Sequence, residues 1–188
     1  MVTSTEIVNQ ALQLIGNNQA PVTGVAPNFD TSTAGQAAAK LYAPTVAAVA
    51  RQFGWDFART KTSLSLTGNT APAPWAYEYA YPTGCVEVWQ LMPATITDPN
   101  NPLPVNWSVG NALVSSVRSR VIWTDLASAT AVFNSNPPEG TWDSLFREAV
   151  VRTLASGLAM ATAGRPDTAQ GLLESAQAFG SMAASRDS

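Results

Sequence analysis

The sequence has no histidine and a single cysteine, Cys85, among its 188 residues. Without histidine, a Ser-His-Asp or Cys-His catalytic arrangement is excluded, and the commonest metal ligand is missing. One cysteine cannot form an internal disulfide, and the shortage of both residue types almost excludes a structural zinc site. We therefore expect no metal and no cofactor. Because Cys85 lies in an apolar segment, we expect it to be a structural core residue.

Charge is also scarce. Charged residues make up 12% of the chain, about half the usual share for a globular protein. The net charge is −3, and there is no Lys or Arg from Thr62 to Val117. Domains that grip nucleic acid concentrate these residues, so we expect no such binding. A lone soluble monomer normally carries more surface charge, which indicates that other chains cover part of this surface.

Long apolar runs and known catalytic motifs are missing as well. No run approaches the roughly 18 apolar residues of a membrane span, and neither phosphate-binding glycine motif occurs. The 13 acidic residues belong to no recognisable motif, which favours a protein that is not an enzyme. If the strands around residues 82–84 pair, Glu78 and Glu87 could approach each other for acid–base chemistry. Otherwise, both carboxylates lie on a solvated strand face.

The segments at both ends of the chain have helical periodicity. The first helix follows a capping-box pair, Thr3 and Glu6, and ends at Gly16. The second begins near Asp30 or Ser32 and closes at Gly54.

Pro44 falls inside the second helix and predicts a kink or a restart there, because proline lacks the N–H of a helical residue. A third helix, with an apolar face from Phe146 to Ala161, ends at Gly164. Pro166 marks the start of a fourth, which should lie antiparallel to the third because the connection is so short.

Between the two helical pairs the pattern is that of β-strands. From about residue 62 to residue 136, short alternating or β-branched runs are separated by turn formers such as residues 98–102 and Gly110-Asn111. The spacing is typical of an antiparallel sandwich. We therefore predict an α+β fold, in which a four-helix bundle (1–61 and 137–188) carries a β-sandwich-like domain (62–136) inserted between helices 2 and 3.

An aromatic strip is the most unusual feature of the β segment. Trp75, Tyr77, Tyr79 and Tyr81 recur every second residue, so a strand would place all four rings on one face. Three explanations stay open: a sheet face packed on its own core, an interface with a neighbouring chain, or a carbohydrate platform. We take these four residues as candidate interface residues, together with two aromatic residues that follow the second helix, Trp55 and Phe57.

The order of these signals resembles a known family. The opening "EIVNQALQLIGNNQAPVTGV" joins a helix ending in "LIG" to a polar loop. The second helix, "AAAKLYAPTVAAVARQFGWDFART", has Leu-Tyr in its middle and an aromatic exit. A Trp-x-Tyr-x-Tyr strand, a Pro turn and a Val-rich strand follow in "APWAYEYAYPTGCVEVWQL". Together, over nearly the whole chain, these motifs resemble the tail tubular protein A family, the head-to-tail adaptors of podovirus-like bacteriophages.

The resemblance implies a structural virion protein rather than an enzyme. Members of that family form a ring of twelve copies at the head–tail junction, between the portal protein and the tail nozzle protein. Genomic DNA passes through the ring without specific binding, and no membrane is involved. The alternatives are a carbohydrate-binding module that uses the aromatic strip and a small muralytic hydrolase that uses paired carboxylates.

Overall fold

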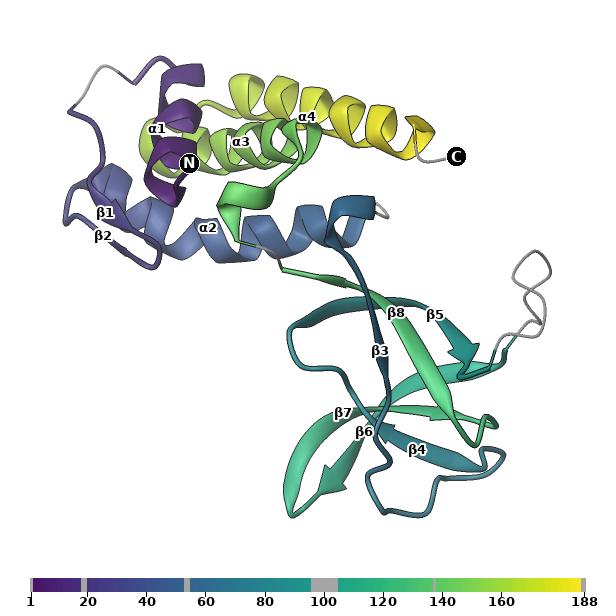
Figure 1. The fold of residues 1–188 in the computed structure, drawn as a ribbon. Coiled ribbons are helices and arrows are strands. Elements are labelled where there is room, and N and C mark those ends of the chain that lie inside the picture. The colour runs from purple at the N-terminus through teal and green to yellow at the C-terminus, as the bar shows by residue number, and fades with distance from the viewer. Residues whose placement is uncertain (1, 18–19, 53–54, 96–104, 137, 187–188) are drawn as a thin grey trace. The chain divides into compact units, whose positions relative to one another are not determined.

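A computed structural model describes residues 2–17, 20–52, 55–95, 105–136 and 138–186. Within these residues the protein is α+β, with four α-helices and antiparallel sheets (Figure 1). The chain divides into two compact units, which we call the helical unit (Met1–Ala58 with Asn136–Ser188) and the β unit (Arg59–Ser135). The first boundary lies before the predicted one, because the first strand of the β unit already begins at Arg59.

Capping residues can be recognised at the starts of α1 and α3 and at the end of the π-helical turn that follows α3. Their bounds are α1 Ser4–Leu14, α2 Thr33–Gln52, α3 Ser144–Leu158 and α4 Pro166–Arg186. Before α1, Thr3 and Glu6 form the predicted capping box. A π-helical turn, Ala159–Ala163, continues α3 and ends at Gly164 in the left-handed conformation (φ 58°). The predicted helix end at Gly54 lies outside the described residues.

Helix α2 is not restarted at Pro44. The helix runs unbroken from Thr33 to Gln52 with the proline inside it, so the predicted restart was wrong. Pro44 is exposed, and the carbonyl that loses its N–H partner can therefore be hydrated. The buried side of α2 includes Ala38, Tyr42 and Val46, which recur every four residues.

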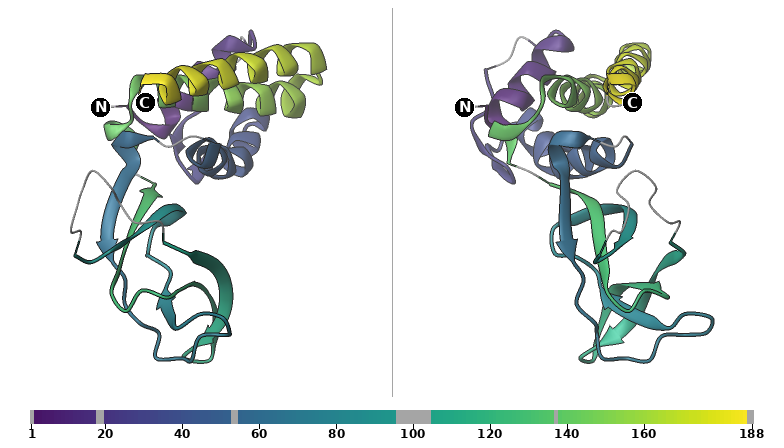
Figure 2. Two further views of the ribbon diagram at one scale, coloured as in Figure 1. Left: turned by 90° about the vertical axis from the view of Figure 1, so that its right-hand side faces the viewer. Right: turned by 45° about the vertical axis from the view of Figure 1, so that its right-hand side comes forward.

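Helix α3 is the central element of the helical unit. It packs against α1, α2 and α4, and α4 lies beside it in the views of Figures 1 and 2. Its buried side chains include Val150, Leu154 and Leu158, at helical spacing. Asp143 caps α3 by accepting a hydrogen bond from the backbone N–H of Leu145 at 2.8 Å.

An aromatic cluster surrounds the start of α3. The ring of Phe146 makes edge contacts with Trp55, Phe57 and Trp142, at centroid separations of 4.9, 5.1 and 4.9 Å. Trp55 is almost fully buried and donates its indole N–H to the carbonyl of Val49 at 2.9 Å. The cluster therefore fixes the end of α2 against the start of α3.

Two short strands belong to the helical unit, and six longer ones form the β unit. The strands of the helical unit are β1 Gly24–Val25 and β2 Asn28–Phe29, a small hairpin in a segment predicted to be a loop. The strands of the β unit are β3 Arg59–Ser63, β4 Tyr77–Ala80, β5 Cys85–Pro93, β6 Trp107–Val114, β7 Val117–Thr124 and β8 Ala129–Ser135.

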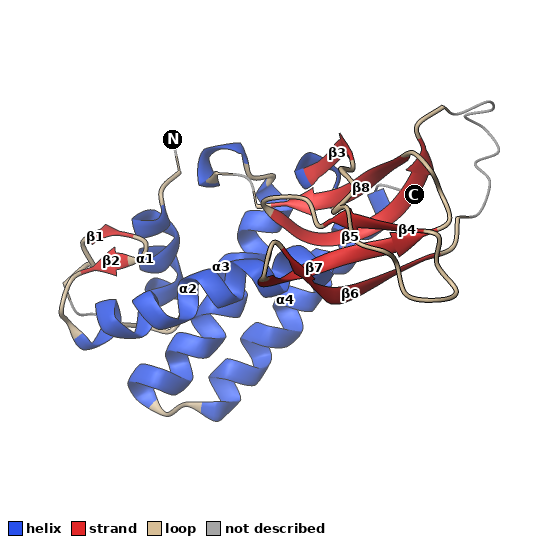
Figure 3. Cartoon of the chain, turned by 90° about the horizontal axis from the view of Figure 1, so that it is seen from below, coloured by secondary structure: helices blue, strands red, loops and turns tan. Residues whose placement is uncertain are grey.

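Two three-stranded antiparallel sheets make up the β unit (Figure 3), in the orders β3-β8-β5 and β4-β7-β6. The chain after β3 links them. The N–H of Leu64 still bonds to Ala129 of β8, whereas Ser65 and Thr67 bond to residues of β4. A core drawn from both sheets includes Tyr79, Val88, Ile122 and Phe133.

The glycine at position 110 is not a turn residue. Strand β6 runs through Gly110 and Asn111, and the β6–β7 turn falls on Ser115 and Ser116, both with positive φ (50° and 67°). Two-residue hairpin turns of this kind need positive φ at both central positions. The predicted turn at Gly110-Asn111 was therefore wrong. The predicted turn at residues 98–102 lies outside the described residues.

We expect Phe146→Ala to destabilise the helical unit by about 3–5 kcal/mol, because it leaves a cavity among three aromatic rings. Urea unfolding followed by far-UV circular dichroism measures this change. The control is Leu173→Ala on α4, where the side chain is exposed and the expected change is within about 0.5 kcal/mol. Equal stabilities for the two variants would contradict the assignment of the cluster as the core of this unit.

Candidate interaction surfaces

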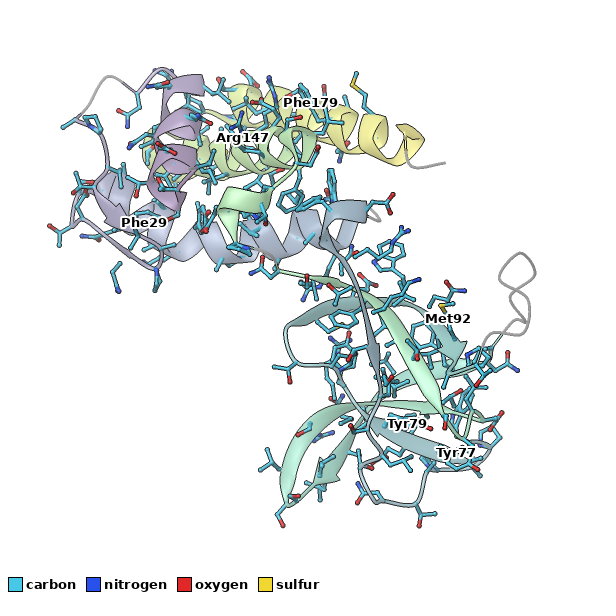
Figure 4. The ribbon with its side chains drawn as sticks, in the orientation of Figure 1. Phe29, Tyr77, Tyr79, Met92, Arg147 and Phe179 are labelled. Atoms are coloured by element: carbon cyan, nitrogen blue, oxygen red, sulfur yellow. The ribbon has the colours of Figure 1, made fainter. Side chains whose placement is uncertain are left out.

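The structure separates the members of the aromatic strip. Tyr79 belongs to the β core, and Tyr77 and Tyr81 pack against that core; Figure 4 labels Tyr77 and Tyr79. The Tyr79 hydroxyl donates to the carbonyl of Leu126 at 2.8 Å. Trp75 precedes β4 in a turn and is half-buried. The three tyrosines therefore cover the core of their own unit. Trp75 and Tyr81 lie just outside β4, at either end of the predicted strand.

Two of the six candidate interface residues are interior. Trp55 and Tyr79 are each 2% exposed, so they have almost no surface to offer a partner, and their selection as interface residues was wrong. Strand periodicity identified the correct face for Tyr79 but could not tell a core face from a contact face. Trp75, Tyr77, Tyr81 and Phe57 keep part of their surface exposed.

Glu78 forms a buried polar cluster on the other face of β4. Its carboxylate accepts hydrogen bonds from the Trp123 indole at 2.8 Å, the Thr67 hydroxyl at 2.7 Å and the Asn69 amide at 2.8 Å. Burial alone would raise the pKa of Glu78, but these donors outweigh it and hold the pKa below its ordinary value of 4.5. Glu78 is 3% exposed, so the prediction that it lies on a solvated strand face was wrong.

Gly110 makes room for one of the donors to Glu78. Trp123 lies opposite Glu78 on β7, and its ring extends over Gly110 on β6. A Cβ on Gly110 would lie 2.1 Å from the nearest ring atom of Trp123. This glycine therefore allows the indole to lie flat across the sheet and reach the carboxylate. Sequence analysis missed this role because the Trp123–Gly110 contact depends on strand register.

The two carboxylates considered for acid–base chemistry lie in different sheets. Glu78 is on β4, which pairs with β7, whereas Glu87 is on β5, which pairs with β8. The pairing that would have brought them together around residues 82–84 is therefore absent, and that expectation was wrong. Glu87 is exposed, as predicted for a solvated strand face.

A hollow of about 380 Å³ lies in the helical unit. Most of its lining is apolar and includes Ala43 and Val46 of α2 and Trp142 before α3. The Tyr42 hydroxyl donates to the Glu139 carboxylate at 3.0 Å, and both residues line the hollow. Burial, together with the charge and hydrogen bond of Glu139, raises the pKa of Tyr42. The hollow thus combines apolar walls with one carboxylate.

The end of the β6–β7 hairpin is exposed and apolar. Leu113 and Val117, next to the turn, are 66% and 64% exposed. Arg118 lies directly opposite Leu113 and is also exposed. Arg120, two residues on, stacks over the Tyr81 ring at 4.1 Å from its centroid. Sequence analysis did not single out this end, because its exposure depends on where the strands extend beyond the core.

Potential metal ligands do not cluster in the described part of the chain. No group of three or more His, Cys, Asp or Glu residues there could hold a metal ion. Cys85 is half-buried and packs against the β core, and burial raises the pKa of its thiol. Among the described residues, no helix is both long enough and apolar enough to cross a membrane.

Comparison with known protein families gives no match for this chain. Comparison with curated proteins gives no significant match either.

We expect Glu78→Ala to destabilise the β unit by about 2 kcal/mol, because it removes the buried carboxylate that accepts hydrogen bonds from Trp123, Thr67 and Asn69. The matched control is Glu87→Ala on the exposed side of β5, with an expected change within about 0.5 kcal/mol. Chemical denaturation followed by tryptophan fluorescence measures both. A loss of the same size in the control would contradict the role of the carboxylate cluster.

Acid should destabilise the wild-type β unit more than it destabilises Glu78→Gln. A carboxylate with a lowered folded-state pKa stabilises the fold above its unfolded pKa, and this contribution is lost as pH falls through the folded value. The excess loss should therefore begin near pH 4.5, the ordinary value, and grow at lower pH. Unfolding curves of both proteins over this range test it, and parallel curves would show that Glu78 is not the group responsible.

Proposed function

We propose that this protein is a head-to-tail adaptor of a bacteriophage virion, a structural protein and not an enzyme. In this proposal, copies of the chain form a ring that joins the portal protein to the tail nozzle protein at the head–tail junction. The observation that carries the proposal is the order of elements: two helices, a β insertion and two helices, with the quoted motifs in the order of the tail tubular protein A family. The number of copies, twelve, rests on that resemblance.

The two units suit different contacts in such a ring. In this proposal the helical unit is a four-helix bundle that contacts the portal and neighbouring copies, and the β unit contacts neighbouring copies and the nozzle. The partly exposed rings of Trp75 and Phe57 and the exposed hairpin end support this, because aromatic and apolar groups are enriched at interfaces. The low charge content supports it too.

DNA would pass through the ring without specific binding. The absence of Lys and Arg from Thr62 to Val117 and the net charge of −3 support this. We expect the channel wall to be neutral to acidic, so that DNA slides without adhering to it. A channel lined with Lys and Arg in the assembled ring would contradict this part of the proposal.

Light scattering of the purified chain, alone and mixed with the portal protein of the same genome, tests the proposal. The chain has a mass of 19.8 kDa, so twelve copies would weigh about 240 kDa. We expect a mass near this value in at least one of the two conditions. A monomer in both conditions, without binding to the portal protein, would overturn the adaptor proposal.

A further inference from the structure

The end of the β6–β7 hairpin carries apolar side chains on both of its faces. Leu113 and Arg118 lie opposite each other on one face, and Val114 and Val117 lie opposite each other on the other. Leu113 and Val117 are the two most exposed of the large apolar residues in the described chain. Surfaces of this kind commonly mark protein contacts.

The charged residues of this hairpin are all basic. Residues 106–124 contain Arg118 and Arg120 and no Asp or Glu. Arg120 already stacks on the Tyr81 ring, whereas Arg118 is exposed beside the apolar end. A contact surface for the hairpin should therefore be apolar and carry a carboxylate.

The hollow of the helical unit combines an apolar lining with a carboxylate. Val46 and Trp142 contribute apolar wall, and Glu139 contributes a half-buried carboxylate. A volume of about 380 Å³ is near the lower limit for ligand pockets, so the hollow suits a few side chains better than a large ligand. The helical unit is also the acidic one: its residues carry six Lys or Arg and nine Asp or Glu, a net charge of 6 − 9 = −3.

We propose that the hairpin end of one copy of this chain docks in the hollow of a second copy. Leu113 then enters the apolar part, and Arg118, which lies on the same face of the hairpin, pairs with Glu139. Val117, on the opposite face, contacts the wall beside the hollow. Because the two surfaces differ, the contact is heterologous, and repetition of such a contact generates a ring when the rotation between copies closes. The inference rests on the proposed function and identifies the surface by which neighbouring copies recognise each other.

Charge reversal tests the pairing. Arg118→Glu and Glu139→Arg should each reduce assembly at least ten-fold, measured as the concentration needed for half-maximal ring formation by light scattering. The double variant should recover most of this loss, because the pair is restored with its charges exchanged. Recovery also separates the pairing from misfolding, since a folding defect in one unit is not rescued by a second change in the other unit. Failure of the double variant to recover would overturn the inference.

Removal of the apolar contact is a second test. Leu113→Ser combined with Val117→Ser should also raise the concentration needed for assembly at least ten-fold. The control is Leu66→Ser, which changes another exposed apolar residue of the β unit and should leave assembly unchanged. Assembly of the double serine variant at the wild-type concentration would overturn the inference.

The outcomes distinguish this inference from the proposed function. If the wild-type chain is a monomer with and without the portal, both are wrong. If the wild type and every hairpin variant form the same ring, the adaptor proposal stands and the docking inference is wrong. If the hairpin variants form rings but lose the portal or the nozzle, the hairpin end contacts that partner instead, and the inference is again overturned.

Discussion

The antiparallel pairing of β3 with β8 is the constraint on which both units depend. Arg59 lies opposite Asn134, and the Thr60 hydroxyl donates to the Ser135 hydroxyl at 3.3 Å. The chain therefore leaves the helical unit and returns to it at neighbouring points. Because the insertion starts and ends at one place, α1 and α2 can pack with a helix that follows much later in the sequence. Without this pairing, α3 would be separated from α2 by a long open segment, and ordering that segment would cost entropy.

A carboxylate-centred contact is found in each unit, half-buried in the helical unit and buried in the β unit. In the helical unit, Glu139 accepts from Tyr42 beside an apolar hollow. In the β unit, Glu78 accepts from three side chains that come from two different segments. The first contact leaves apolar surface next to a partly exposed charge, which a partner can use. The second contact is made entirely within the unit, where three side chains of the β unit donate to the buried carboxylate.

The functional proposal depends on which apolar and aromatic side chains are exposed. Three of the six aromatic rings first suspected of binding a partner, Tyr77, Tyr79 and Tyr81, cover the β core. Among the large apolar residues of the described chain, Leu113 and Val117 are the most exposed. An interaction protein needs exposed apolar groups together with a matching surface. In the docking proposal, the hairpin end and the hollow of the helical unit supply both in one chain, as assembly of identical copies requires.

Much of the fold could be predicted from the sequence, because its strongest signals are local. The capping box at Thr3 and Glu6, the left-handed glycine at 164, and the helical spacing of Ala38, Tyr42 and Val46 depend only on residues within a few turns. The insertion of β structure between two helical pairs was equally visible. The interface candidates were less predictable, because period-two spacing assigns Tyr79 to a face without saying what covers that face.

The sequence by itself therefore determined the α+β class and the order of the four helices and the β insertion, although not the β1–β2 hairpin or the course of β6 through Gly110. Only the tertiary structure decided which strands pair, and with it the burial of Glu78, the separation of Glu78 from Glu87, and the role of Gly110 beneath Trp123. The physical reason is that strand pairing joins residues distant in the chain, and a side chain's environment follows from that register rather than from its sequence neighbours.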